Sequence, residues 1–305
     1  MNAIEVTNLV KHYRDVKAVD DISFTIKEGT ICGILGPNGS GKTTTIKCIC
    51  NIIIPDQGEI KLLGKDHYQA YKYISTLFEG NRNLYWRLTP RENLRYFAGL
   101  RGLGGRKLEN QIDELLERFN LQSKRNVVVN NLSRGMQQKV AIAMTLISNT
   151  DIVLLDEPTL GLDVQTTVEI KNILRSISKD MKKTVLLSSH DMHLVQDVCE
   201  EVIVINKGKV VVQDRVSNLL DMFSRMTYEI VFLEHLTEEL KDELQSFNNK
   251  FYLINDSKIE LDLASYDEIY SLVDYFKEKN LTIKEFKQKE INFERIYLEY
   301  TKEVN

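Results

Sequence analysis

Apolar and polar residues alternate along much of the first sixty residues, and this period of two predicts β-strands within residues 4–26. Residues 31–35 are instead continuously apolar and lead directly into a glycine-rich turn. Residues 40–53 contain no helix breaker ahead of Pro55, so they predict a helix, and residues 58–62 predict the next strand. The N-terminal part of the chain should therefore contain a strand–loop–helix–strand unit.

The apolar spacing changes to three and four residues further along, which indicates helices and predicts an inserted helical subdomain at about residues 88–148. Apolar runs return at residues 152–155, 184–187 and 202–205, separated by helical patterns. Short, fully apolar runs between helices are typical of buried parallel strands in an α/β fold. One domain at residues 1–215 should therefore include both sides of the insertion.

A second pattern of strands and helices begins at residue 216 and predicts a small α+β accessory domain at residues 216–305. No motif in this region points to chemistry. Its apolar helix faces are explained by a core, with subunit contact or regulation as the alternative. The predicted strands are 227–233, 251–254, 259–263 and 281–286, and the predicted helices are 238–247, one around 269–276 and one around 293–300.

Charge and composition narrow the possible partners of this 305-residue chain. Forty basic and 44 acidic residues give a net charge of −4, so binding to nucleic acid is not expected. No apolar stretch approaches the ~18–20 residues of a membrane-spanning helix, and the first residues do not resemble a secretory signal. The four cysteines lack metal-site spacing. We therefore expect a cytoplasmic chain with buried free thiols.

Residues 36–43 match the phosphate-binding pattern G-x-x-x-x-G-K-[ST], between a predicted strand and a predicted helix. Backbone N–H groups of such a loop surround the β- and γ-phosphates of a nucleotide, and the helix N-terminus adds partial positive charge. Lys42 should neutralise phosphate oxygens, and the Thr43 hydroxyl should bind Mg²⁺. A chance glycine turn would rarely have these flanks. The predicted ATP contacts here are Gly36, Asn38, Gly39, Ser40, Gly41, Lys42, Thr43 and Thr44.

Two acidic residues, Asp156 and Glu157, follow the apolar run 152–155. Ligands of parallel sheets bind at the carboxyl ends of the strands, which places both carboxylates beside the phosphate loop. Asp156 should hold Mg²⁺ through water, and Glu157 should accept a proton from an attacking water molecule. Two acids after a strand also fit a helix cap or a solvated turn, but the nearby phosphate loop favours catalysis.

His190 follows the predicted strand 184–187 and should reach the same sheet edge as Lys42 and Glu157. A neutral imidazole there could hydrogen-bond the γ-phosphate. The alternative is a metal pair with His193, but no third ligand accompanies it. The predicted catalytic residues are therefore Glu157, His190 and Lys42.

Residues 131–138 read NLSRGMQQ, and with the motifs above the sequence resembles the ATP-binding cassette (ABC) family over residues 1 to about 215. Alone, Ser133 would be explained as a helix N-cap. The resemblance implies that Tyr13 stacks on adenine and that residues 160–163 contact an opposite subunit. It also implies two subunits arranged head to tail, with each ATP between Lys42 of one and Ser133 and Gly135 of the other.

The sequence departs from the family pattern in two places. The signature motif normally reads LSGGQ, and here Arg134 and Met136 replace a glycine and the glutamine, while Ser133 and Gly135 remain. The family also has a Mg²⁺-sensing glutamine within the segment corresponding to residues 77–85, where this chain has none. We expect Glu79 to supply a metal-binding oxygen there. The alternative is an exposed loop in which Glu79 contacts nothing.

The resemblance implies a P-loop NTPase core of the α/β class, with a mixed, mainly parallel sheet, an antiparallel β subdomain, the helical insertion and the α+β C-terminal domain. It implies an ATP-binding and ATP-hydrolysing subunit of an exporter, peripheral on the inner face of the membrane through separately encoded permease subunits. The C-terminal domain resembles that of drug- and antibiotic-export ATPases.

The sequence argues against two other functions. A soluble cassette ATPase acting on ribosomes or DNA usually has two cassettes or a long coiled coil, and the roughly 90 residues between the P-loop and the signature contain no sustained heptads. A regulatory binder without hydrolysis is disfavoured because Glu157 and His190 are both present.

Overall fold

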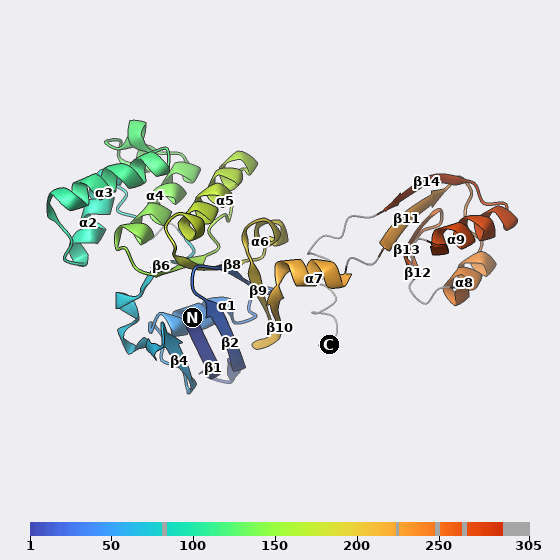
Figure 1. Cartoon of the computed structure of the whole chain (residues 1–305), viewed down its shortest axis with the longest axis horizontal. Helices are drawn as coiled ribbons and strands as arrows, with labels where there is room; N and C mark the ends of the chain where they lie inside the picture. The colour runs from blue at the N-terminus through green and yellow to red at the C-terminus, as the bar shows by residue number, and fades with distance from the viewer. Residues whose placement is uncertain (81–83, 224–225, 248–250, 264–266, 289–305) are drawn as a thin grey trace. The chain divides into compact units, whose positions relative to one another are not determined.

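The structure is a computed structural model that describes residues 1–80, 84–223, 226–247, 251–263 and 267–288. The chain forms two compact units, one containing Met1–Val216 and a second that begins at Ser217 (Figure 1). Each unit is considered by itself below. In the described residues no helix is both long enough and apolar enough to cross a membrane.

A six-stranded sheet forms the centre of the first unit, in the order β10-β9-β3-β8-β7-β6. The pairs from β9 to β6 are parallel, and β10 is antiparallel to β9. Strands β3, β7, β8 and β9 are buried at every position because helices or the second sheet cover both faces. The strands are β3 (Ile31–Leu35), β6 (Ile74–Leu77), β7 (Ile152–Asp156), β8 (Thr184–Ser189), β9 (Glu201–Asn206) and β10 (Lys209–Arg215).

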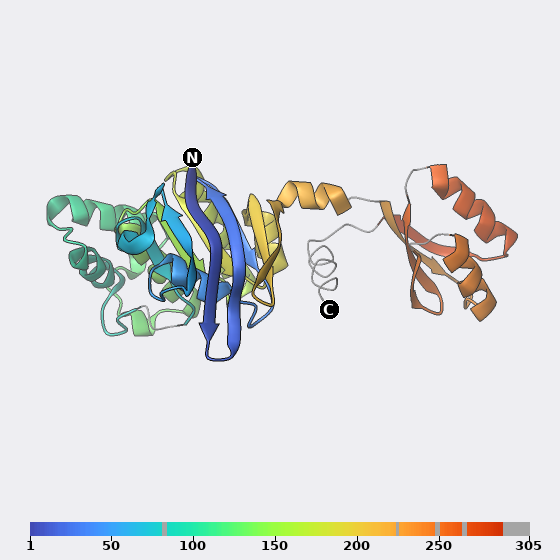
Figure 2. The same cartoon turned by 90° about the horizontal axis from the view of Figure 1, so that it is seen from below.

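A four-stranded antiparallel sheet with the order β2-β1-β4-β5 packs next to the central sheet. Its long first two strands run side by side in Figure 2. One apolar core joins the two sheets and includes Ile4, Ile46 and Leu154. The strands are β1 (Asn2–Tyr13), β2 (Val16–Lys27), β4 (Gln57–Leu62) and β5 (Lys65–Asp66).

Helix α1 (Lys42–Ile49) follows β3 and its glycine-rich turn, as predicted, but it is shorter than the predicted span of residues 40–53. It begins after Gly41, whose φ of 108° excludes it from the helix. The backbone turns at Asn51, which has a φ of 55°, a left-handed conformation that commonly follows a helix C-terminus. Local backbone geometry, and not Pro55, therefore ends the helix.

The chain between β6 and β7 forms the helical insertion. Although about 75 residues separate these strands in sequence, they are paired neighbours, with Leu77 opposite Leu155. Thr89 begins the insertion's first helix with a capping box to Glu92. The insertion contains α2 (Pro90–Leu100), α3 (Gly105–Arg118) and α4 (Arg134–Ile147), with short 3-10 turns at Gln122–Lys124 and Val129–Asn131. Another 3-10 turn, His67–Lys72, precedes β6, and α5 (Val164–Lys179) and α6 (Met192–Val198) pack on the central sheet.

The second unit is a four-stranded antiparallel sheet, ordered β12-β13-β11-β14, with two helices in a βαββαβ sequence. Tyr228, Ile230 and Phe276 belong to its own apolar core. Helix α7 (Val216–Phe223) starts at the division between the units. The other elements are β11 (Met226–Phe232), α8 (Glu238–Phe247), β12 (Phe251–Asn255), β13 (Lys258–Leu263), α9 (Asp267–Glu278) and β14 (Ile283–Gln288). The helix predicted around 293–300 lies outside the described residues.

All four cysteines are free, and three of them, Cys32, Cys48 and Cys199, are buried. Cys50 is only partly buried. The prediction of buried thiols therefore holds for three of the four cysteines.

Candidate active site

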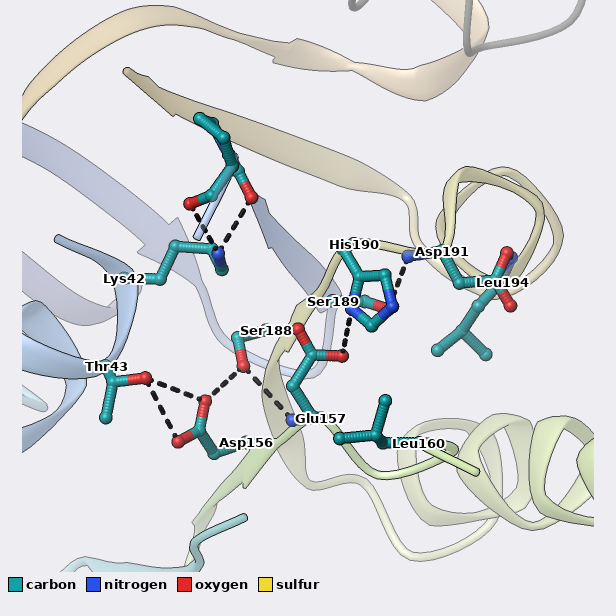
Figure 3. Close-up of polar contacts among 12 residues, drawn as sticks. Lys42, Thr43, Asp156, Glu157, Leu160, Ser188, Ser189, His190, Asp191 and Leu194 are labelled. Carbon is teal, nitrogen blue, oxygen red and sulfur yellow. Dashed lines mark hydrogen bonds and ion pairs between the residues drawn. The ribbon is translucent and has the colours of Figure 1, made fainter. Parts of the chain in front are cut away.

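The glycine-rich turn between β3 and α1 forms one wall of the site. Lys42, only 8% exposed, donates from Nζ to the carbonyl oxygens of Gly36 at 2.7 Å and Pro37 at 3.1 Å (Figure 3). Burial lowers the pKa of its ammonium group, and the negative charges of Glu157, Asp156 and Glu79 oppose that shift. The ammonium group is therefore held inside the turn and faces three carboxylates.

Ser40 provides an independent indication that this turn binds a polar ligand. Its side chain is buried, and its hydroxyl oxygen has no hydrogen-bond partner among the residues that the structure describes. Buried hydroxyls are normally satisfied, so an unpaired one needs an outside partner. Phosphate oxygens fit this need. Asn38 and Gly39 at the tip of the turn are exposed, and Thr44 is half-buried.

Thr43 and Asp156 meet across the gap between α1 and the end of β7. The Thr43 hydroxyl lies 3.2 and 3.4 Å from the two carboxylate oxygens of Asp156, which is 3% exposed. Two oxygen donors beside a phosphate-binding turn suit Mg²⁺, which proteins commonly hold through one or two side chains together with substrate phosphates. Among the residues that the structure describes, no group of three or more His, Cys, Asp or Glu could hold a metal alone.

Ser188, at the end of β8, joins the two acidic residues. Its fully buried hydroxyl donates to Asp156 Oδ1 and accepts from the backbone N–H of Glu157 at 3.1 Å (Figure 3). The sequence analysis assigned Ser188 no role, because a serine inside an apolar strand gives no local signal of a contact 32 residues away.

Glu157 is the residue at which the chain leaves β7. Its φ of 50° is unusual for a residue with a side chain, and the carboxylate is only 10% exposed. Glu157 Oε2 lies 3.0 Å from Nδ1 of His190, which follows β8 and is 55% exposed (Figure 3). The structure thus brings together the acidic residue and the histidine that the sequence selected.

The contact with Glu157 limits the tautomer of His190. An ionised carboxylate only accepts hydrogen bonds, so Nδ1 of His190 is the donor to Glu157 when that carboxylate is ionised. Nε2 is then the ring nitrogen that remains for a phosphate oxygen, and the hydrogen bond to the γ-phosphate stays a prediction.

Ser133 and Gly135 lie at the start of α4. Ser133 is exposed and caps the helix, because its hydroxyl accepts from the Met136 N–H at 3.3 Å. Gly135 is buried, and an added Cβ would come within 2.5 Å of the Thr166 side chain. Gly135 is therefore required for close packing within the chain, in addition to any contact with a nucleotide.

Two further predicted residues are solvent-accessible. Tyr13 ends β1 opposite Val16 and is 45% exposed, so its ring is available for stacking. Glu79 follows β6 and is exposed, and its charge acts on Lys42. The loop bearing Glu79 continues into residues 81–83, which lie outside the described residues.

The chain matches the ABC transporter family model over residues 19–160. It is 37% identical over 241 residues to the ABC transporter ATP-binding protein NatA of Bacillus subtilis, covering 76% of this chain and 98% of that protein. This chain belongs to the ABC transporter family. Its cassette therefore has the nucleotide-binding and ATPase fold of the family.

Other relatives of this ABC ATPase are named for opposite directions of transport. It is 39% identical to the Nod factor export ATP-binding protein I of Sinorhizobium fredii, covering 72% of this chain and 64% of that protein. It is 33% identical to the methionine import ATP-binding protein MetN 2 of Bacillus licheniformis, covering 80% and 75%. The family thus includes both import and export subunits.

A solved structure shares the architecture of the cassette. The dimeric post-hydrolysis state of the ATP-binding cassette MJ0796, bound to ADP and Pi, has a TM-score of 0.63 and 28% identity, and the match covers 70% of this chain and 98% of that one. The predicted α/β fold of the P-loop NTPase class is confirmed. ATP hydrolysis is the activity of this fold family.

Proposed function

We propose that this chain is the ATP-binding and ATP-hydrolysing subunit of an exporter that works through separately encoded transmembrane permease subunits. The main support is the contact of 3.0 Å between Glu157 and His190, next to the buried Lys42 ammonium. The relatives include both export and import proteins, so they do not decide the direction of transport. The predicted resemblance of residues 216–305 to export ATPases supports export.

In the proposed reaction, Glu157 is the general base. Its carboxylate accepts a proton from the attacking water molecule, and such a step contributes roughly 10²–10⁴-fold to the rate. Lys42 neutralises charge on the β- and γ-phosphates, and its low exposure strengthens that interaction. His190 fixes the Glu157 carboxylate through Nδ1. Backbone N–H groups of residues 36–44 hold the phosphates, and Tyr13 supports the adenine ring.

Thr43, Asp156 and Glu79 are the oxygen donors that we assign to Mg²⁺. Mg²⁺ held by these residues would supply Lewis-acid polarisation of the phosphate oxygens. Asp156 is held for this role by Ser188 and Thr43. Glu79 lies in the segment where the family has a glutamine, and its charge acts on Lys42.

The second partner is another ATP-binding subunit, either a copy of this chain or a close relative. One chain supplies Lys42, Asp156 and Glu157 to its nucleotide, and the opposite chain supplies Ser133 and Gly135 to the same nucleotide. The exposed position of Ser133 is consistent with this arrangement. ATP closes the two cassettes, and hydrolysis lets them reopen.

The permease is expected to dock on the helical insertion, which keeps the chain cytoplasmic and peripheral on the inner face of the membrane. An open cavity of about 510 Å³ lies between β6 and helices α2 and α4. Tyr85 and Phe97 contribute aromatic surface to it, and Tyr85 is 48% exposed. The other lining residues are Ser75, Thr76, Leu77, Leu84, Leu100, Arg101, Ala141, Met144, Thr145 and Ser148.

The Glu157→Gln variant tests the chemistry. It should bind ATP with parental affinity, lose roughly 10²–10⁴-fold in kcat, and accumulate as an ATP-bound dimer in size-exclusion chromatography. Glu117→Gln is the matched control, since Glu117 is an exposed acid on α3 and should leave kcat unchanged. Parental turnover by the Glu157→Gln variant would remove Glu157 from the mechanism.

Affinity purification of the full chain from detergent-solubilised membranes tests the partner. Recovery of a polytopic membrane protein, released when the lining residue Tyr85 is replaced by Asp, supports the transporter subunit. Recovery of ribosomes or DNA in its place would contradict the proposal.

A further inference from the structure

Arg134, which replaces a glycine of the usual signature motif, is the first residue of α4, and its side chain contacts the loop that follows Glu157. Its Nη2 donates to the carbonyl oxygen of Leu160 at 3.2 Å. Figure 3 shows Leu160 on the same short loop as Glu157. The first residue of α4 therefore contacts the segment that begins with the proposed catalytic base.

The guanidinium group also covers Gly161. A Cβ at Gly161 would lie 2.5–2.7 Å from the terminal atoms of Arg134, and Gly161 has a φ of 68°. The positive φ favours glycine at this position, and an added Cβ would displace the flexible end of the Arg134 side chain from the backbone. A planar guanidinium can lie flat on a peptide backbone and donate to a carbonyl at once, whereas an ammonium group cannot do both.

Helix α4 holds the same loop at two other points. Gln138 Nε2 donates to the Pro158 carbonyl oxygen at 2.8 Å. The Thr166 side chain packs against Gly135, and Thr166 is itself bonded to the helix-capping Asp163 at the end of the loop. At its other end the loop is fixed by the hydrogen bond between the Glu157 N–H and Ser188. Residues 157–163 are thus held between β8 and α4.

We propose that Arg134 is a positioning residue for Glu157, acting through Leu160 and Gly161. Without the Arg134 side chain over Gly161, residues 158–161 lose their link to the first turn of α4, and the Glu157 carboxylate shifts relative to His190. This inference rests on the proposed role of Glu157 in hydrolysis. Since Ser133 next to Arg134 faces the nucleotide of the opposite chain in that proposal, Arg134 also joins the two nucleotide sites of a dimer.

The test uses the full-length chain and steady-state ATP hydrolysis. Arg134→Ala should lower kcat by roughly 10- to 100-fold, because displacing a catalytic group by about 1 Å costs on the order of 10²-fold, while the KM for ATP changes less than about twofold. Arg106→Ala is the matched control, because Arg106 is also an exposed arginine and lies on α3. Both variants should melt within about 2 °C of the parent, since each replaces a surface side chain.

A direct contact between Arg134 and the nucleotide of the opposite chain makes a different prediction. It would weaken the ATP-trapped dimer, so the dimer is compared in the Glu157→Gln chain with and without Arg134→Ala. Our proposal expects an equal dimer fraction at each ATP concentration. A dimer that needs at least about tenfold more ATP in the double variant would overturn it.

A double-mutant cycle with Gly161→Ala tests the contact itself. The added Cβ strains the backbone in either background but meets the guanidinium only when Arg134 is present. The fold-decrease in kcat that Gly161→Ala causes should therefore be at least about threefold smaller in the Arg134→Ala chain than in the parent. Additive losses would show that Arg134 does not act through Gly161. Arg134→Lys should recover less than half of the lost activity.

The outcomes also separate this inference from the proposed function. If the parent hydrolyses ATP, Glu157→Gln does not and Arg134→Ala matches the parent, only the positioning role fails. If Glu157→Gln hydrolyses ATP like the parent, the assignment of the base fails first.

Discussion

The two nucleotide-facing surfaces of the cassette are built in different ways. On the P-loop side, Lys42, Asp156 and Ser188 are almost fully buried and bonded to other parts of the same chain. On the signature side, Ser133 is exposed, and within the described residues its hydroxyl is bonded only to its own helix. The first surface is preorganised within one chain, whereas Ser133 on the second surface is accessible from outside the chain. Binding and hydrolysis should therefore be separable by mutation.

Among the variants that test this difference between the two surfaces, loss of the Lys42 charge should have the largest effect. Lys42→Ala removes a charge-assisted bond to phosphate of about 1.5–3 kcal/mol, which predicts an ATP affinity roughly 10- to 150-fold lower. Titration of a single-chain preparation with a fluorescent ATP analogue measures this affinity. Lys47→Ala, on the same helix, is the control and should bind normally. Equal affinity in both variants would mean that the P-loop surface does not bind phosphate.

Ser188→Ala should give the next largest effect. It leaves the buried Asp156 carboxylate and the Glu157 N–H without this partner, at a cost of about 1–3 kcal/mol in the free energy of unfolding. We also expect kcat to fall about tenfold while ATP binding is retained. Ser178→Ala removes another buried hydrogen bond, to Gly29, far from the site. Its stability loss should be similar and its kcat unchanged, as chemical denaturation and ATPase assays can establish.

Ser133→Ala should have the smallest effect on a single chain. It removes the N-cap of α4, which costs about 1 kcal/mol of stability, and it should leave ATP affinity unchanged. Hydrolysis by the dimer should fall. Thr89→Ala, which removes the cap of α2, is the control with the same stability cost and no effect on hydrolysis. A loss of single-chain ATP affinity in Ser133→Ala alone would erase the contrast between the two surfaces.

The residues that the sequence predicted to lie close together share one property. Lys42, Asp156, Glu157 and His190 each follow a short apolar run, directly or after a short loop, and parallel strands bring the carboxyl ends of such runs to one edge. The apolar periodicity and the rule that the carboxyl ends of parallel strands lie at one edge were therefore sufficient to predict that these residues are close in space. The central strands were predicted for the same reason, because their apolar runs are continuous.

What the sequence analysis missed depends on contacts between distant segments. Ser188 resembles any strand serine until β7 and β8 pair, and Arg134 resembles a solvated arginine until α4 meets the loop at Gly161. The left-handed φ of Glu157 is likewise set by this surrounding structure. The length of α1 was overestimated because Asn51 ends the helical turn without a proline. Pattern rules describe one segment at a time and cannot anticipate such pairs.

The pairing of β6 with β7 has a mechanical consequence. Because β6 and β7 are parallel, the insertion leaves the sheet at the carboxyl end of β6 and returns at the amino end of β7. Leu77, the last residue before the insertion, lies opposite Leu155, which directly precedes Asp156. A force that a partner applies to the start of the insertion would therefore reach the sheet beside Asp156 and Glu157.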